Sequence, residues 1–412
     1  MARLFVSTPP QCGPHWHWHK RQGVPLGQQE GAAGRRVRCQ NLVFRQMGRL
    51  FAALFSYCAA HAQPFDFTHF ETSLLPQWLR LFRAGATPGA YSFLSANASA
   101  GPTLYGSADV AHVLATTNTL GNLSAADRAV WAAQINSFQS PATGFFAVAP
   151  WEQAGLQPWH AAAYATAALA LLGAQPAAPL AWAVSVAVGG PAAWAAEFQG
   201  LLNATTPSCP SIWCTGHKIA AFPAALLMTR GRERDGAFFA WWAGVFLGPA
   251  VDPATAMWCS RREWAPPSVA CLGGAFHMDF VLTALRQPLF LPRTLLAVVA
   301  GMQDSKTGLW GGDASPNYID LDGVYQVVRP AAQVGASGGP EWAAARATCV
   351  RYLAAAEAAL NDPARVLGKV YGANSHILPA AVAGVSECAK FFPELVRTVR
   401  PWVQTLDVAP FV

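Results

Sequence analysis

A run of small and apolar residues that recurs about every fifty residues constrains the fold more than any other feature of the sequence. Each run follows small or polar turn residues, and its apolar positions have helical rather than alternating spacing. The six runs cover residues 106–120, 158–173, 215–231, 271–288, 318–330 and 374–393. A repeat of about fifty residues is the length that a helical hairpin with its loops requires. The sequence therefore predicts an all-α chain built from repeated hairpins.

A second set of helices is expected between these runs, where the sequence is more mixed in polarity. These partner helices are predicted at 66–84, 124–139, 190–202, 235–247, 291–303 and 341–360. No period-two strand pattern of any length occurs between them. We therefore predict one domain over residues 63–412, an (α/α) toroid of about six helical hairpins with the more apolar helices inside.

Polar residues stand near the start of each apolar run. Five runs carry a histidine there, and the run at 318–330 carries two aspartates instead: His112, His160, His217, His277, Asp320, Asp322 and His376. A single buried histidine is usually a core residue or a helix cap. Several imidazoles in one cavity, however, make proton transfer near neutral pH feasible. We expect these residues to face a central funnel.

No metal or other cofactor is predicted for this set of residues. Zinc needs three or four ligands in tetrahedral contact at about 2 Å. One histidine per helix around a wide ring rarely meets that requirement, and the chain from residue 63 onward has no His-x3-His pair.

Two short segments resemble repeats of a known superfamily. "QSPATGFF" at 139–146 and "QDSKTGLW" at 303–310 share a glutamine, a glycine five residues later and an apolar pair with an aromatic residue. This pattern resembles the α/α-toroid proteins, the terpenoid cyclases and protein prenyltransferases, in which the glutamine and the aromatic residue lock successive hairpins. The resemblance implies the toroid, a layout shared by (α/α)6 polysaccharide lyases and glycosidases.

The chain departs from those families at their catalytic motifs. It has Asp-Leu-Asp-Gly at 320–323, where a class II terpenoid cyclase has Asp-x-Asp-Asp. A prenyltransferase zinc set at the family spacing is not evident. Because one fold serves many reactions, the resemblance cannot choose among them.

The aspartates and histidines supply the first candidates for acid/base catalysis. Asp320 and Asp322 are two residues apart and point about 200° away from each other on a helix. Only one can face the funnel, and we favour Asp322 as a general acid or base. Alternatively, Asp320 caps the helix and Asp322 complements its positive end. His277 and His217 are the other first choices for proton transfer.

A second group of candidates lies in "VYGANSHILP" at residues 370–379. Tyrosine, histidine and asparagine are the residue types with which (α/α) polysaccharide lyases neutralise a uronate carboxylate and move the C5 proton, so this segment resembles such a site. The resemblance implies catalytic roles for Tyr371 and His376, and a substrate-binding role for Asn374. His160 and His112 are further substrate-binding candidates. The alternative is a turn with an asparagine cap.

The basic charge is concentrated at the N-terminus. Residues 1–62 hold eight of the 28 basic residues and one of the 22 acidic residues, so the rest of the chain is nearly neutral. A nucleic-acid partner is therefore not expected, because it requires basic residues on the folded domain. Residues 1–46 form a basic leader that an over-extended gene start would explain, and residues 47–62 match a signal peptide. An organelle transit peptide is the alternative.

Cysteines and glycosylation sequons favour export. Six cysteines follow residue 62, and three Asn-x-Ser/Thr sequons begin at Asn97, Asn122 and Asn203. Short loops suggest pairing within Cys209–Cys214 and Cys259–Cys271, with the full connectivity left open. Prolines interrupt the long uncharged stretch from 153 to 196, so no stable membrane span is expected.

The sequence as a whole predicts a secreted enzyme that acts on a carbohydrate polymer or glycan by general acid/base chemistry in the funnel. Hydrolysis and elimination both remain open. The alternatives are a terpenoid-cyclase-like enzyme with an aromatic-lined apolar cavity, or a non-catalytic ligand-binding toroid with a filled funnel.

Overall fold

The computed structural model describes residues 63–149, 158–199, 212–248, 250–259, 268–335 and 337–411. The predicted leader and signal peptide, Cys209 and Asn203 lie outside these ranges. Helices dominate the described residues, where the named strands are β1 (Phe65–Asp66) and β2 (Val396–Arg397). The all-α class is therefore confirmed.

Six helices form the interior, and each corresponds to one of the predicted apolar runs. They are α3 (Leu104–Thr116), α5 (Pro158–Leu171), α8 (Ile212–Arg230), α10 (Val269–Ala284), α12 (Tyr318–Val334) and α15 (Leu378–Phe391). In α5, for example, every residue from His160 to Leu169 is buried. A helix that is apolar all round must be surrounded by protein, and this explains why these sequences lack a polar face.

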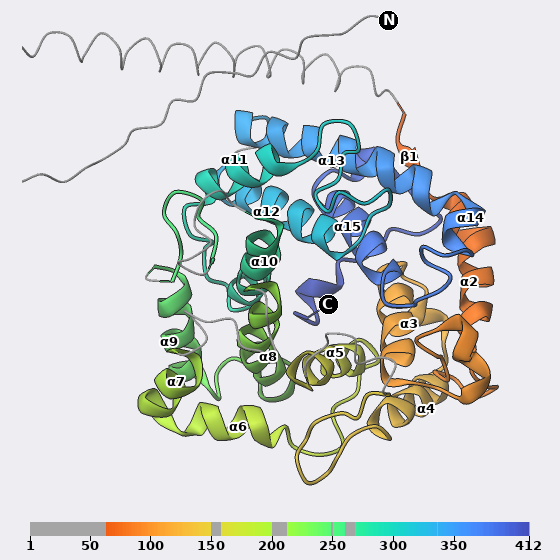
Figure 1. The fold of residues 1–412 in the computed structure, drawn as a ribbon, viewed down its shortest axis with the longest axis horizontal. Coiled ribbons are helices and arrows are strands. Elements are labelled where there is room, and N and C mark those ends of the chain that lie inside the picture. The colour runs from red at the N-terminus through yellow and green to blue at the C-terminus, as the bar shows by residue number, and fades with distance from the viewer. Residues whose placement is uncertain are drawn as a thin grey trace, which may run out of the picture. The chain divides into compact units, whose positions relative to one another are not determined.

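The six inner helices contact one another in a closed cycle (Figure 1). Each packs against the next along the chain, and α15 packs against α3. Side chains from the first halves of these helices meet, as the contact between Tyr105 and His160 illustrates. The helices therefore run in the same direction, with their N-terminal ends on one side.

The remaining helices lie outside this cycle (Figure 1). They are α2 (Leu75–Phe82), α4 (Ala125–Asn136), α6 (Ala181–Val188), α7 (Gly190–Gln199), α9 (Gly236–Phe246), α11 (Pro292–Met302), α13 (Pro340–Leu360) and α14 (Pro363–Val366). The five predicted partner helices from 124 onward correspond to α4, α7, α9, α11 and α13, whereas the segment predicted at 66–84 holds a π-turn before the shorter α2. Helix α6 was not predicted separately, because its uncharged residues continue the apolar stretch before it.

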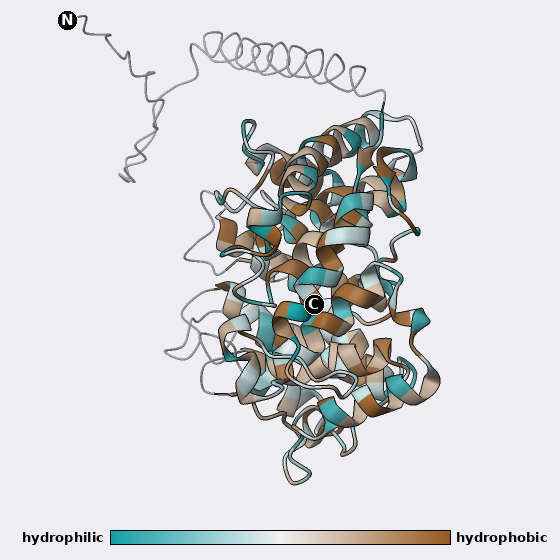
Figure 2. Cartoon of the chain, turned by 90° about the vertical axis from the view of Figure 1, so that its right-hand side faces the viewer, coloured by the Kyte–Doolittle hydropathy of each residue, from teal (hydrophilic) through white to brown (hydrophobic). Residues whose placement is uncertain are grey.

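Polar and apolar residues are interspersed along the helices on the face shown in Figure 2. No helix in the described ranges combines the length and the apolar character that a membrane crossing requires.

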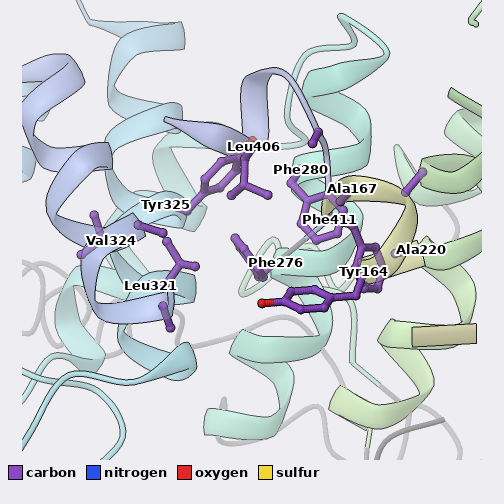
Figure 3. Close-up of a cluster of buried hydrophobic side chains, with 14 of the residues drawn as sticks. Tyr164, Ala167, Ala220, Phe276, Phe280, Leu321, Val324, Tyr325, Leu406 and Phe411 are labelled. Atoms are coloured by element: carbon purple, nitrogen blue, oxygen red, sulfur yellow. The ribbon is translucent and has the colours of Figure 1, made fainter. Parts of the chain in front are cut away.

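The two ends of the folded unit meet where β1, which contacts α13, pairs with β2, which contacts α15. Strand β1 pairs in parallel with β2, and the Ser375 N–H donates to the Phe93 carbonyl oxygen at 2.9 Å. The last residues then enter the space inside the cycle, where Figure 3 places Leu406 and Phe411 among side chains of the inner helices. The C-terminal segment is thus part of the core.

The two segments that carry the superfamily resemblance make the same hydrogen bonds. The Gln139 amide donates to the Gly144 carbonyl at 3.2 Å and to the Ala178 carbonyl at 2.9 Å. The Gln303 amide donates to the carbonyls of Gly308 at 2.8 Å and Thr348 at 3.2 Å. Each glutamine therefore fastens its own turn to a later outer segment, as the resemblance implied.

Glycine is required in both turns. Gly144 and Gly308 have φ angles of 76° and 74°. A Cβ atom on either residue would lie 2.4 Å from a backbone oxygen, that of Pro179 or of Arg351 respectively. The turns therefore approach the neighbouring chain too closely for any side chain.

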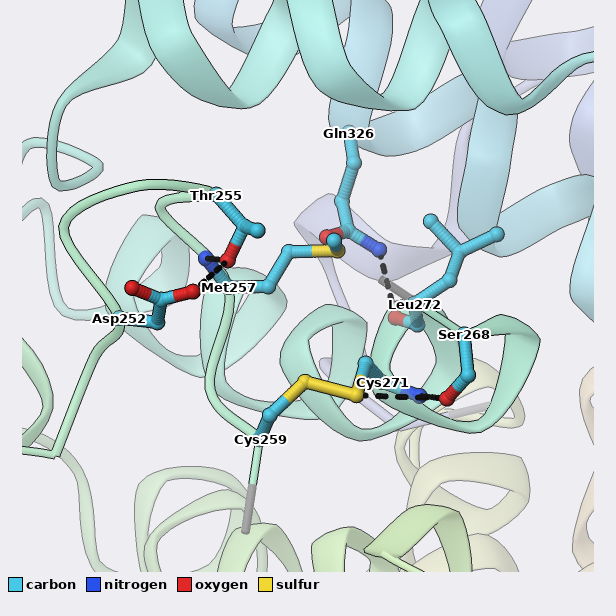
Figure 4. The surroundings of a disulfide bond; sticks show 8 residues. All are labelled: Asp252, Thr255, Met257, Cys259, Ser268, Cys271, Leu272 and Gln326. Carbon is cyan, nitrogen blue, oxygen red and sulfur yellow. Dashed lines mark hydrogen bonds between the residues drawn. A yellow bond between two sulfur atoms is a disulfide. The ribbon is translucent and has the colours of Figure 1, made fainter. Parts of the chain in front are cut away.

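The predicted disulfide between Cys259 and Cys271 is present (Figure 4). It joins the segment at 250–259 to the first turn of α10, whose N-cap residue Ser268 accepts a hydrogen bond from the Cys271 N–H at 3.2 Å. Cys214 is also disulfide-bonded, whereas Cys349 and Cys388 are buried free thiols.

Alanine substitutions at Gly308 and Gly312 should separate the two reasons why a turn requires glycine, namely a positive φ angle and a close approach of neighbouring backbone. Gly312 has a φ of 73° but nothing within 4 Å of its Cβ position, so Gly312→Ala should lower the unfolding free energy by only about 1 kcal/mol. Gly308→Ala should cost about 1–3 kcal/mol more, because the Arg351 carbonyl belongs to the backbone of α13 and cannot move aside. Urea denaturation of both variants measures the difference. Equal losses would contradict a tight approach to Arg351.

Candidate functional site

The first halves of the inner helices bring a group of polar side chains together. The central cluster comprises Tyr105, Asp109, His160, Tyr164, His217, His277, Tyr318 and His376. Five elements contribute through α3, α5, α8, α10 and α12, and His376 precedes α15 by two residues. Sequence analysis selected the four histidines of this cluster and missed Asp109 and the three tyrosines.

Three of the histidines form a row across neighbouring helices. The ring centroids of His160 and His217 lie 4.5 Å apart, and those of His217 and His277 lie 4.4 Å apart. His376 approaches the row from the other side, with its centroid 5.9 Å from that of His160. Histidines separated by up to 216 residues in the chain are thus in ring contact or close to it.

Asp109 organises one side of the cluster. Its carboxylate is fully buried and accepts hydrogen bonds from the Tyr164 hydroxyl at 2.7 Å, the Ser375 hydroxyl at 2.5 Å and Nδ1 of His376 at 2.8 Å. Three donors from α5 and the segment before α15 therefore converge on one carboxylate of α3. Such satisfaction is what makes a buried charge tolerable.

The contact with Asp109 fixes the state of the His376 ring. A carboxylate can only accept, so Nδ1 of His376 carries a proton in this contact, and the ring is oriented with Nε2 directed away from Asp109. Nε2 makes no hydrogen bond to the described part of the chain, and the side chain is 13% exposed. A buried aspartate that orients a histidine in this way is the arrangement found for general bases.

A tyrosine and a histidine form a second polar pair next to this one. The Tyr105 hydroxyl lies 2.7 Å from Nδ1 of His160, and the edge of His376 packs on Tyr105 with ring centroids 4.9 Å apart. Burial, followed by the charge of Asp109, raises the pKa of Tyr164 well above its usual value. Tyr164 is therefore a permanent hydrogen-bond donor and not a proton acceptor.

The buried histidines are neutral at physiological pH. Burial lowers the pKa of His277 to about 4, and it lowers the pKa of His160 and of His217 well below the usual 6.5. The ring of His217 is partly exposed at its edge, although its Nδ1 atom is buried without a partner. The row can therefore bind hydrogen-bond donors without carrying charge.

Asp322 lies on α12, one turn after Tyr318, and is isolated. It is 1% exposed, and neither carboxyl oxygen has a hydrogen-bond partner among the described residues. Burial raises its pKa well above the ordinary value, and the charge of Asp320 adds to this effect. Burial therefore favours the protonated, neutral form of Asp322.

Asp320, two residues before Asp322, makes hydrogen bonds that stabilise the start of α12. Its carboxylate accepts the backbone N–H groups of Trp310 at 2.7 Å and Asn317 at 2.8 Å. Asn317 is the N-cap residue, and Asp320 completes its capping box. The alternative in which Asp320 is the N-cap residue is thus wrong, because Asn317 holds that position and Asp320 only completes the cap. The contacts of Asp320 add no support for the catalytic prediction.

Three further candidates stand in framework positions. The Tyr371 hydroxyl donates to the Pro316 carbonyl at 3.0 Å, and the Asn374 side chain accepts the His376 N–H at 2.8 Å. His112 stacks on Tyr164 with centroids 4.5 Å apart, and neither of its ring nitrogens has a hydrogen-bond partner in the described ranges. Their catalytic or substrate-binding roles stay predictions, and Asn374 contributes by presenting His376.

Within the described ranges, no group of three or more His, Cys, Asp or Glu side chains could hold a metal ion. One open hollow of about 400 Å³ lies between the ends of α8 and α10, lined by Arg230, Arg232 and Arg286. It lies at the opposite helix ends from the central cluster, and the arginines there complement helix C-termini.

One signal in the sequence could have revealed Asp109. Tyr105, Asp109 and His112 are spaced i, i+4 and i+7, so they share one face of a helix. An acid on such a face inside an apolar run has to find donors in the protein. The donors themselves could not be predicted, since Ser375 and His376 are more than 260 residues away.

Comparisons with protein-family models, with curated proteins and with solved structures found no match to this chain. The chemistry of the site therefore has to be argued from the geometry of its own residues.

The free energy of unfolding should decrease as the pH is lowered, because of His112. Burial lowers its folded-state pKa to about 4, so the unfolded chain, with a pKa near 6.5, binds the proton more readily between these values. This single histidine should reduce the unfolding free energy by about 2 kcal/mol at pH 5 relative to pH 8. His112→Leu should flatten the curve by that amount in denaturation experiments at both pH values. Parallel curves for the two proteins would contradict the assignment.

Proposed function

We propose that the chain is an (α/α) toroid enzyme that acts on a carbohydrate polymer or glycan by general acid/base chemistry. The toroid is supported by the closed cycle of inner helices and by the two matching glutamine turns. The reactive site is the central cluster at the N-terminal ends of those helices. The observation that carries the proposal is the Asp109–His376 pair, whose free Nε2 is available next to the row of neutral histidines.

His376 is the proposed base. Asp109 holds its Nδ1–H at 2.8 Å and stabilises the imidazolium that forms when Nε2 takes a proton. Tyr318 is close by, with its hydroxyl 3.4 Å from Nδ1 of His376 and the two ring centroids 4.8 Å apart. Tyr318 is therefore placed to orient a substrate group beside the base.

Asp322 is the proposed acid. It is the carboxyl group that burial keeps protonated one turn beyond Tyr318. A neutral carboxylic acid can donate a hydrogen bond or a proton to a substrate oxygen, and such groups operate in other enzymes at pH 7. The base thus lies two residues before α15 and the acid lies on α12, which packs against α15.

A carbohydrate is favoured by the aromatic and polar character of the site. One partly buried indole borders the histidine row, that of Trp213, 5.8 Å from the His217 ring. An indole beside uncharged hydrogen-bonding groups suits a polyhydroxylated ring with an apolar face. The Cys259–Cys271 disulfide and the exposed sequon at Asn122 are compatible with secretion.

A non-catalytic ligand-binding toroid is the second candidate, and the C-terminal segment favours it. Leu406 and Phe411 are buried inside the cycle (Figure 3), so one part of the expected funnel is filled. A binding protein would need only the hydrogen-bonding surface of the cluster and not the proton transfer.

Substitutions at the pair should abolish turnover. The protein would be incubated with neutral and uronate-containing polysaccharides, with hydrolysis read from reducing ends and elimination from ultraviolet absorbance of the unsaturated product. His376→Ala and Asp109→Asn should each lower kcat by at least ~10²-fold, as loss of an oriented general base requires. His69→Gln, an exposed histidine at the first helical turn, serves as control. Undiminished turnover in His376→Ala would remove the base assignment, and binding without turnover would favour the second candidate.

The neutral state of Asp322 can be observed without a substrate. At pH 7 the infrared difference spectrum between the native protein and Asp322→Asn should contain the carbonyl band of a protonated carboxylic acid. Asp322→Leu should raise the unfolding free energy at pH 7 by about 1–3 kcal/mol while lowering kcat, because a buried polar group without a partner is removed.

The sign of the pH effect follows from the direction of the pKa shift. The folded state binds the proton of Asp322 more tightly than the unfolded state, so this residue destabilises the protein increasingly as pH rises above about 4. The gain from Asp322→Leu should consequently be smaller at pH 4 than at pH 7. An ionised carboxylate in the infrared spectrum at pH 7 would overturn the acid assignment.

A further inference from the structure

The C-terminal segment 402–411 enters the cycle from the ends of the inner helices that lie opposite the central cluster. The Val403 N–H donates to the carbonyl oxygen of Thr116, the last residue of α3, at 2.8 Å. The Gln404 amide donates to the carboxylate of Glu387 in α15 at 2.5 Å. A short 3-10 turn, η6 (Thr405–Asp407), then packs against α3 and α10.

A charged network fastens this entry point. Arg329 of α12 forms an ion pair with the buried Glu387 and donates to Asp407 at 2.9 Å. Lys390 of α15 also pairs with Asp407. The buried Arg329–Glu387 pair orients the Arg329 guanidinium toward Asp407, and the Gln404 amide donates to the same glutamate, so these contacts hold the segment where it enters.

The segment ends on Phe411, directly beneath the histidines. Its ring is fully buried, and its centroid lies 5.2 Å from that of His160, 6.2 Å from that of His277 and 5.7 Å from that of Phe280. Figure 3 shows Phe411 beside Phe280 and Tyr164. One aromatic ring thus touches the histidine row from inside the cycle.

The position of this ring matters because of the state of His277. Nδ1 of His277 lies 2.6 Å from the Gly273 carbonyl oxygen, which can only accept, so Nδ1 carries the proton and Nε2 is bare. Nε2 is buried and has no partner among the described residues. The Phe411 ring, with its centroid 6.2 Å from that of His277, is an apolar neighbour of this imidazole and helps to keep water from it.

We propose that Phe411 is a positioning residue that forms the floor of the site, holding His160 and His277 in place and closing the cycle against water from the C-terminal side. A ligand then enters only from the N-terminal ends of the inner helices. The floor itself follows from the contacts of the segment, and only its effect on turnover rests on the proposed function.

The test is a titration of the histidine side chains by NMR in the full-length protein. Phe411→Ala should raise the pKa of His277 from about 4 by at least one unit, because burial is the main cause of its depression. The groups that interact with His277 are the neutral rings of His217 on α8 and His160 on α5. The acids on α10 and α12, Asp279 and Asp322, are buried as well.

Matched variants separate positioning from a general loss of stability. Phe411→Leu refills most of the space and should restore a pKa near 4, whereas Phe411→Val, which is less disruptive than alanine, should shift it in the same direction as Phe411→Ala. Val408→Ala changes an exposed residue of the same segment and should leave the titration unchanged.

An unchanged His277 titration in folded Phe411→Ala or Phe411→Val would overturn the proposal. If turnover of a glycan is established, Phe411→Ala should also lower kcat at least ~10-fold with little change in KM and shift its pH profile toward that of a hydrated imidazole. The titration tests the role of Phe411 even where no turnover is found. The proposal for Phe411 and the proposed enzymatic function can therefore fail separately.

Discussion

The hydrogen bonds to Asp109 are the interaction on which both the fold and the site depend. The carboxylate belongs to α3, and its donors are Tyr164 of α5 and the adjacent Ser375 and His376 before α15. It therefore joins the first inner helix to the second and to the last, where the cycle closes. A buried carboxylate without donors would cost several kcal/mol, so the closure and the orientation of His376 require each other.

The rest of the interior is less completely satisfied, and several of the exceptions lie on the inner helices. His112, His277 and Asp322 each have at least one buried polar atom without a hydrogen bond in the described part of the chain. Each such atom costs about 1–3 kcal/mol, which apolar residues of similar volume would avoid. Unsatisfied groups in a core that is otherwise rich in alanine, leucine and phenylalanine are expected where function, rather than stability, has selected the residues.

The sequence was sufficient for the helices and insufficient for their partners. Apolar runs with helical spacing located all six inner helices, because a helix surrounded by protein has no polar face to obscure the pattern. The histidines near the starts of these runs were found in the same way, because they recur at about the same place in each run. Asp109 and the tyrosines escaped notice since their roles depend on contacts across up to 267 residues. The segment ending in Phe411 has no periodicity at all, and only the three-dimensional path shows that it fills the interior.

The common direction of the inner helices adds an electrostatic term to this arrangement. Their N-terminal ends, each with a partial positive charge, surround the central cluster, and one such end contributes typically 0.3–1 kcal/mol to a nearby charge. This field opposes protonation of the histidines, in the same direction as the burial that dominates their pKa values. It also favours negative charge near the first turns of these helices. The parallel inner helices thus add to the effect of burial, which is the main cause of the low histidine pKa values.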